Sequence, residues 1–214
     1  MDYPIWVNDG VNPRPKEPVF YELARNGFFI TRENQFWRAT VPVSQISILE
    51  QEIPSLKLLI PPLPKALIVD VLRFFVWIFK EYGTEVAILI YISVDKKSYS
   101  IQVPYQVVSP GFVNYKIPNR LRDRFLIGTI HSHGHMDAFH SPTDTCDERS
   151  IDGIHITFGS FSRFRDDFSV SIDGAINGTR FHLNPVHWIR GIKKAEKKVE
   201  KNLYSYGIFD NSAL

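Results

Sequence analysis

The stretch GTIHSHGHMDAFHSPTDTCDE, residues 128–148, concentrates the side chains of this chain that could do chemistry. It holds four of the seven histidines, three of which alternate at positions 131, 133 and 135, and it also contains the only cysteine. These residue types fit a metal centre, a cysteine nucleophile with a histidine base, or a polar loop without chemistry. The spacing of the residues decides among the three.

His131 and His133 end the apolar segment FLIGTIHSH (125–133), which predicts a strand. Residues two apart on a strand point to the same face, so the two imidazoles should project together. In SPTD, Ser141 is a good helix N-cap, and a helix starting there would bring Asp144 back toward the strand end. Two histidines and one carboxylate leave a fourth position for water, which is typical of a catalytic zinc site.

Each part of this pattern also has an interpretation without metal. Ser-x-x-Asp is an ordinary capping pair, and an isolated His-x-His is common at strand ends. The combination of both is rarer and favours the metal site.

The neighbouring residues are given other roles. Gly134 should end the strand, so His135 is expected to be exposed or to lie behind the ligands. His140 precedes the cap and could line the substrate entrance, but a solvated loop residue is favoured. Cys146 would lie near a helix N-terminus that could activate a thiolate, but no orienting Asn or Asp stands out, and a buried, inert Cys is favoured. The later histidines are interpreted as structural: His155, His182 and His187.

The motif consists of His131-Ser132-His133, then seven residues, Ser141, two residues and Asp144. This spacing resembles the signature of the JAMM (MPN-plus) zinc metalloproteases. The resemblance covers about residues 65–185. The phrase VPYQ and the flank at 1–60 look most like bacterial members encoded beside ubiquitin-activating-like and ubiquitin-conjugating-like proteins. Two departures from the family are Gly134, where it often has proline, and the absence of glycine from VAILIYIS.

The resemblance implies that His131, His133 and Asp144 bind Zn²⁺ and that Ser141 hydrogen-bonds the oxyanion. It also implies an upstream glutamate as general base and acid. Glu85 is expected to fill this role, because it precedes the strand that should run beside the histidine strand. A solvated Glu85 is the alternative interpretation, and Glu81 is then the substitute.

The hydrophobic pattern predicts a mixed α/β (α+β) fold, which the resemblance makes an MPN-like sheet flanked by helices. We expect an N-terminal extension with short strands over 1–60, a catalytic domain over 61–188, and a lysine-rich helix and tail over 189–214. Within these, a helix is predicted over 65–82 with Gly83 as its C-cap. Predicted strands lie around RENQ in 27–43 and over 85–94, 99–107, 125–133, 154–159, 168–174 and 179–185.

Composition narrows the function classes. The 214 residues carry a net charge of only +2, so nucleic acid is a weak candidate partner, suggested only by the lysines at 190–201. The apolar stretch 66–79 is too short to cross a bilayer, and the N-terminus lacks the features of a signal peptide. A single Cys fits a reducing compartment, and we expect a cytoplasmic protein without a membrane partner.

Two functions from different classes follow. The first is a zinc isopeptidase or peptidase that hydrolyses the amide bond at the C-terminal tail of a ubiquitin-like modifier, by deconjugation or by precursor processing. E1-like and E2-like proteins would be its further partners. The second is a non-catalytic MPN-like binding or scaffold module, against which the intact motif argues.

Overall fold

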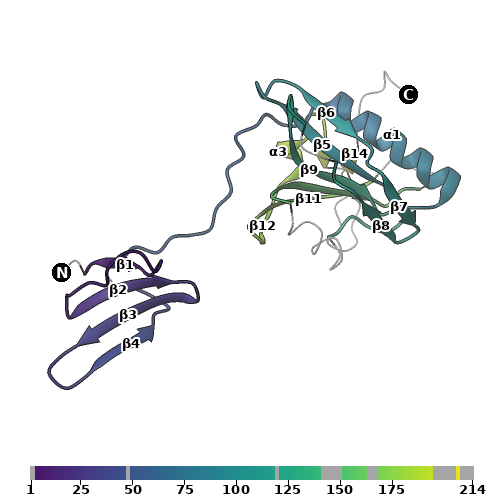
Figure 1. Ribbon diagram of the computed structural model, residues 1–214. Helices are drawn as coiled ribbons and strands as arrows, with labels where there is room; N and C mark the ends of the chain where they lie inside the picture. Colours follow the sequence, from purple (N-terminus) through teal and green to yellow (C-terminus); the bar gives the residue numbers. More distant parts are fainter. Residues whose placement is uncertain are drawn as a thin grey trace. The chain divides into compact units, whose positions relative to one another are not determined.

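The computed structural model describes residues 3–46, 49–118, 121–140, 151–162, 168–194 and 206–207. The chain divides into two compact units, residues 1–54 and 55–214 (Figure 1). Residues 55–60, which the sequence placed in the N-terminal extension, lie in the second unit. There Leu56, Leu58 and Ile60 pack against the core.

The first unit is a four-stranded sheet in the order β1-β2-β3-β4. Its strands are β1 (Ile5–Val7), β2 (Val19–Ala24), β3 (Gly27–Glu33) and β4 (Arg38–Pro42). The predicted strand pair in 27–43 matches β3 and β4, whose turn is closed by Asn34 Oδ1 accepting from the backbone N–H of Phe36 and Trp37. The sequence did not reveal β1, which pairs in parallel with β2.

The second unit is built on a six-stranded mixed sheet in the order β12-β11-β10-β9-β5-β6. Only β9 and β10 run parallel, and the other neighbours are antiparallel. The strands of this sheet are β5 (Ala87–Ser93), β6 (Tyr99–Gln102), β9 (Arg124–Ser132), β10 (Gly153–Gly159), β11 (Ser169–Ile176) and β12 (Thr179–His182). The remaining elements are α1 (Lys65–Tyr82), the hairpin β7 (Gln106–Ser109) and β8 (Phe112–Tyr115), α3 (Pro185–Trp188), β13 (Lys193–Lys194) and β14 (Tyr206–Gly207).

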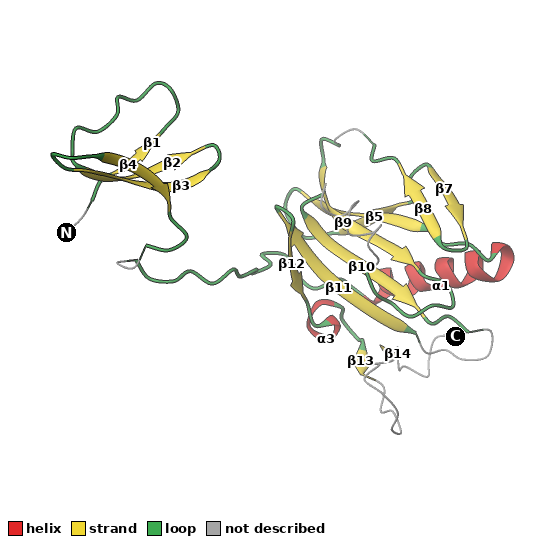
Figure 2. Ribbon diagram, turned by 90° about the horizontal axis from the view of Figure 1, so that it is seen from below, coloured by secondary structure: helices red, strands yellow, loops and turns green. Residues whose placement is uncertain are grey.

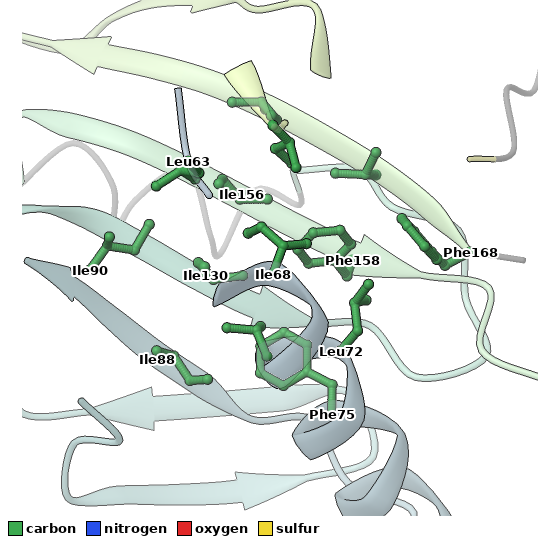
Figure 3. Packing of buried hydrophobic residues seen from close by; sticks show 14 of the residues in the cluster. Leu63, Ile68, Leu72, Phe75, Ile88, Ile90, Ile130, Ile156, Phe158 and Phe168 are labelled. Carbon is green, nitrogen blue, oxygen red and sulfur yellow. The ribbon is translucent and has the colours of Figure 1, made fainter. Parts of the chain in front are cut away.

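Helix α1 covers one face of this sheet (Figure 2). As predicted, it ends at Gly83, which adopts φ 65° and donates its N–H to Phe79 O. The buried stripe of α1 consists of Ile68, Val71, Leu72 and Phe75. These residues pack on an apolar sheet face (Figure 3) formed by Ile88, Ile90, Ile130, Ile156 and Phe158 among others. Burial of such side chains is the main source of stability, at about 1.5–3 kcal/mol for each.

On β9, β10 and β11 the opposite face of the sheet is polar. Thr129 and His131 of β9 alternate with the core residue Ile130, and they pair across the strands with His155 and Thr157 of β10. Asp173 of β11 pairs in turn with His155. All of these polar residues are buried. The sheet therefore separates an apolar face that makes the core from a polar face that can hold a site.

The predicted α/β class is confirmed at the level of a strand-rich mixed architecture, and two local predictions are wrong. The predicted strand 99–107 is divided between β6 and β7, consistent with Pro104 lacking an N–H to donate. The segment 189–194 is not helical, because Ile189 is buried in a bridge with Leu63 and Gly191 has φ 79°. The helix was predicted to run to 207, but Tyr206–Gly207 form β14. Residues 195–205 lie outside the described residues, as does the predicted short helix after the histidines.

In the described ranges, no helix combines the length and the apolar character that crossing a membrane would require.

Candidate functional site

The two histidines of the motif sit at the carboxyl end of β9, held between its neighbouring strands. The N–H of Ser132 donates to Val86 O at 3.0 Å, and the N–H of His133 donates to Phe158 O at 2.8 Å. His131 and His133 are 5% and 3% exposed. The strand end therefore carries two buried imidazoles on the polar face of the sheet.

The imidazole rings of His131 and His133 converge. Their Nε2 atoms are 3.2 Å apart. Two nitrogens bound to one tetrahedral Zn²⁺ at about 2.0–2.1 Å would be about 3.4 Å apart, so the pair is close to the spacing that the metal requires. The same distance also fits a hydrogen bond between the rings when no metal is bound.

Hydrogen bonding favours a metal-binding form of His133. Its Nδ1 lies 3.3 Å from the backbone oxygen of Asp137, which can only accept, so Nδ1 carries the proton. Its Nε2 then carries a lone pair that faces His131. An accepting carbonyl behind a histidine is the usual partner of a metal ligand. His131 Nε2 also faces the hydroxyl of Thr157, at 3.3 Å.

Glu85 lies beside this pair. Ala87 of β5 is opposite His131, and the bond between Val86 and Ser132 continues the antiparallel register, so Glu85 falls opposite His133. Alternation along the strand puts Glu85 on the same face as the two imidazoles. Glu85 is only 4% exposed, and its N–H donates to Ser109 O at 2.9 Å.

The alternative interpretation of Glu85 as a solvated residue is wrong, because Glu85 is buried. Glu81 is exposed on α1, the helix that covers the apolar face. Of the two glutamates, the structure thus brings only Glu85 to the histidines. Ala87, small and fully buried, leaves room for the imidazole of His131 across the strand pair.

Gln106, which was not predicted as a site residue, supports this end of β5. Gln106 Oε1 accepts from the N–H of Ala87 at 2.8 Å, and Gln106 Nε2 donates to Ala87 O at 3.1 Å. Its side chain thereby occupies the position of a neighbouring strand beyond the end of β6. The only signal in the sequence was its place in VPYQ.

Ser141, Asp144 and Cys146 lie outside the described residues. Among the residues that the structure does describe, no cluster of three or more His, Cys, Asp or Glu is placed to hold a metal. The described part of the motif thus supplies the histidine pair, and the third ligand remains a prediction from the sequence.

His135 is exposed, whereas the side chain of His140 is buried. Gly134 reverses the chain at φ 54°, which proline cannot adopt, and His135 is exposed with its ring 6.3 Å from that of Phe79. The interpretation of His140 as a solvated loop residue is wrong. Its side chain is 6% exposed, with Nε2 3.7 Å from Asp173 Oδ2.

Asp173 was not predicted to lie near the site. Besides facing His140, it accepts hydrogen bonds from Arg180 and from His182 Nδ1, the latter at 3.0 Å. The ring of His140 is 6.5 Å from that of His131, so this acidic side chain stabilises the histidine-rich region from β11. The only indication of Asp173 in the sequence was the alternation of apolar and polar residues in FSVSIDG (168–174).

His155 has the structural role expected of it. Its Nδ1 is 2.9 Å from Thr129 Oγ1, and its Nε2 is 3.0 Å from Ile151 O. Burial lowers the pKa of His155 to about 4, against the smaller opposing effect of the Ile151 carbonyl. It is therefore neutral at pH 7 and acts as a buried hydrogen-bonding group under the site.

No protein-family model matches the chain, and no curated protein matches it.

Proposed function

We propose that this protein is a zinc-dependent isopeptidase or peptidase with an MPN-like catalytic domain, acting on the C-terminal tail of a ubiquitin-like modifier. The observation that carries the proposal is the placement of Glu85, His131 and His133 on one buried sheet face, with the two Nε2 atoms 3.2 Å apart. A carboxylate beside a converging histidine pair is the arrangement that zinc-assisted amide hydrolysis requires.

The geometry of the two described histidines supports zinc as the proposed metal. His133 offers Nε2 with its proton fixed on the far nitrogen, and His131 offers Nε2 at a matching distance. Asp144 is proposed as the third ligand, giving two nitrogens and one oxygen with one position open. Zinc held there supplies Lewis-acid chemistry, since it acidifies water and polarises the scissile carbonyl.

Glu85 is proposed as the proton carrier. Its carboxylate takes a proton from the attacking water and returns it to the leaving amine, so that one amide bond breaks and a carboxyl group and an amine form. Burial and the backbone bond to Ser109 keep Glu85 in one position. Ser141 is proposed to donate a hydrogen bond to the oxygen that becomes negative.

The substrate class comes from the family resemblance. An extended tail suits this fold, because β6 is an edge of the large sheet and an extended peptide can pair with a sheet edge. E1-like and E2-like proteins are proposed as partners in the same system. The burial of Glu85 beside the histidines disfavours the scaffold alternative, since a binding module has no need of a sheltered carboxylate there.

The test is hydrolysis of ubiquitin-like fusion proteins by the full chain, with metal analysis of the purified protein. We expect one zinc per chain and activity that a chelator removes and added zinc restores. Glu85→Gln should abolish activity while zinc remains bound, because the amide keeps the shape of the carboxylate but cannot accept the proton.

Glu81→Gln is the matched control and should leave activity unchanged, since Glu81 is exposed on α1. A protein that holds no zinc, or that hydrolyses its substrate equally well in chelator, would contradict the proposal.

A further inference from the structure

Behind His133 lies a peptide group that contacts both the His133 ring and the buried side chain of Ser169. The carbonyl of Asp137 faces His133 Nδ1 at 3.3 Å, and the N–H of the next residue, Ala138, donates to Ser169 Oγ at 2.7 Å. These two atoms belong to one planar trans peptide, so the C=O and the N–H point in opposite directions. Fixing the N–H on Ser169 therefore directs the C=O at His133.

Ser169 is itself held in a short chain of hydroxyl groups. Its oxygen is 2.8 Å from Ser160 Oγ, and Ser160 donates to a carboxylate oxygen of Asp137. The carboxylate can only accept, so the direction of the chain is set: Ser169 donates to Ser160, and Ser160 donates to Asp137. The chain starts at the N–H of Ala138 and ends on the adjacent Asp137, which closes a ring around one peptide.

The surrounding backbone supports this ring. The N–H of Ser160 donates to Met136 O at 2.6 Å, and the N–H of Phe161 donates to Gly134 O at 2.9 Å. A Cβ on Gly159 would lie 2.2 Å from Met136 O, so glycine is required for the close approach. Ser160 holds φ 61°, a conformation that costs energy for residues other than glycine. The loop after His133 is thus locked to the end of β10.

We propose that Ser169, assisted by Ser160, is a positioning residue that fixes the tautomer and orientation of His133 through the Asp137–Ala138 peptide. Ser169 does not touch the metal or the substrate. The proposal rests on the proposed function for the identity of the bound metal, and it adds the device that keeps the proton on Nδ1 and so leaves the Nε2 lone pair able to coordinate zinc.

The test compares Ser169→Thr with Ser169→Val. The two side chains have the same shape, and only threonine keeps the hydroxyl, so any effect of crowding at this buried position is common to both. Zinc affinity is measured by competition with a chelator in the full chain. We expect Ser169→Val and Ser169→Ala to lower zinc affinity about 10–100-fold, and Ser169→Thr to stay near wild type.

A second variant grades the effect. Ser160→Gly removes the next hydroxyl and relieves the positive φ, so the fold is retained. In this variant Ser169 still accepts a hydrogen bond from the N–H of Ala138. Ser160→Gly should therefore lower zinc affinity less than Ser169→Ala does. Ser93→Ala is the matched control. Ser93 Oγ also donates to an aspartate and accepts from a backbone N–H, but it lies at the other end of β5.

Nitrogen chemical shifts of the His133 ring in the metal-free protein give a readout that does not depend on zinc or on activity. Wild type should hold the proton on Nδ1, and Ser169→Ala should show a mixture of tautomers. Equal zinc affinities in the threonine and valine variants, or an unchanged tautomer in Ser169→Ala, would overturn the inference. If wild type bound no zinc but the tautomer still depended on Ser169, the proposed function would fail and the positioning role would stand.

Discussion

Replacing Gln106 with methionine tests how the site end of β5 is held. Methionine has nearly the same length as glutamine but cannot replace either hydrogen bond to Ala87. The backbone of Ala87 is fully buried and lies beyond the reach of β6, whose last pair is Leu89 with Gln102. The loss therefore leaves one donor and one acceptor without their present partner.

The magnitude follows from those two bonds. Each contributes a net ~0.5–1.5 kcal/mol, and a buried group left unsatisfied costs about 1–3 kcal/mol. Since partial rearrangement of the hairpin can recover some of this, we expect the free energy of opening at Ala87 to fall by about 2–4 kcal/mol. Glu85 lies two residues away and is bonded to Ser109 of the same hairpin, so its position should change as well.

Native-state hydrogen exchange of the Ala87 amide, followed by NMR in the full chain, measures the opening energy directly. Hydrolysis assays should show kcat reduced about 10–100-fold with a smaller change in KM, because misplacing a reacting group by a fraction of an ångström weakens the transition state. Gln102→Met is the control, since Gln102 is exposed on β6. Exchange at Ala87 that stays as slow in Gln106→Met as in wild type would refute the reasoning.

Two further predictions concern stability. The pKa of His155 is about 4 when folded against 6.5 for the ordinary side chain. The unfolded chain therefore binds more protons in this window, and lowering the pH from 6.5 to 4 should remove about 3 kcal/mol of stability. His155→Gln should flatten that part of the curve in denaturant titrations across pH, and an identical slope in both proteins would contradict the assignment. Gly128→Ala should destabilise the second unit by at least about 3 kcal/mol, because a Cβ there would lie 1.7 Å from Ile154 O at φ 152°. Gly111→Ala, where a Cβ meets nothing within 4 Å, should be close to neutral, and thermal unfolding of both variants measures the difference.

Local patterns in the sequence predicted what depends on periodicity. The stripe of α1, the central strands and the shared face of His131 and His133 all follow from spacings of three, four and two residues. The lysine-rich segment after Trp188 shows the limit of that approach. Its helical pattern was overruled at Ile189, which is buried in a bridge with Leu63 far along the chain.

Contacts between side chains and distant backbone could not be predicted in this way. Gln106 reaches Ala87 across 19 positions, and Ser169 reaches Ala138 across 31. Neither residue belongs to a spaced motif, and each becomes visible only when the strands are placed side by side. The same is true of Asp173, whose partner His140 lies on a loop with no periodicity of its own.

The central strands carry two kinds of buried side chain, one kind on each face of the sheet. In the middle of β9, β10 and β11, core side chains such as those at 130, 156 and 172 alternate with buried polar side chains such as those at 131, 155 and 173. Folding and chemistry are thus interleaved on the same strands. A substitution of one of these core residues should act first on stability, and a substitution of His131 should act first on the site. Deleting one residue would exchange the two sets and abolish both at once.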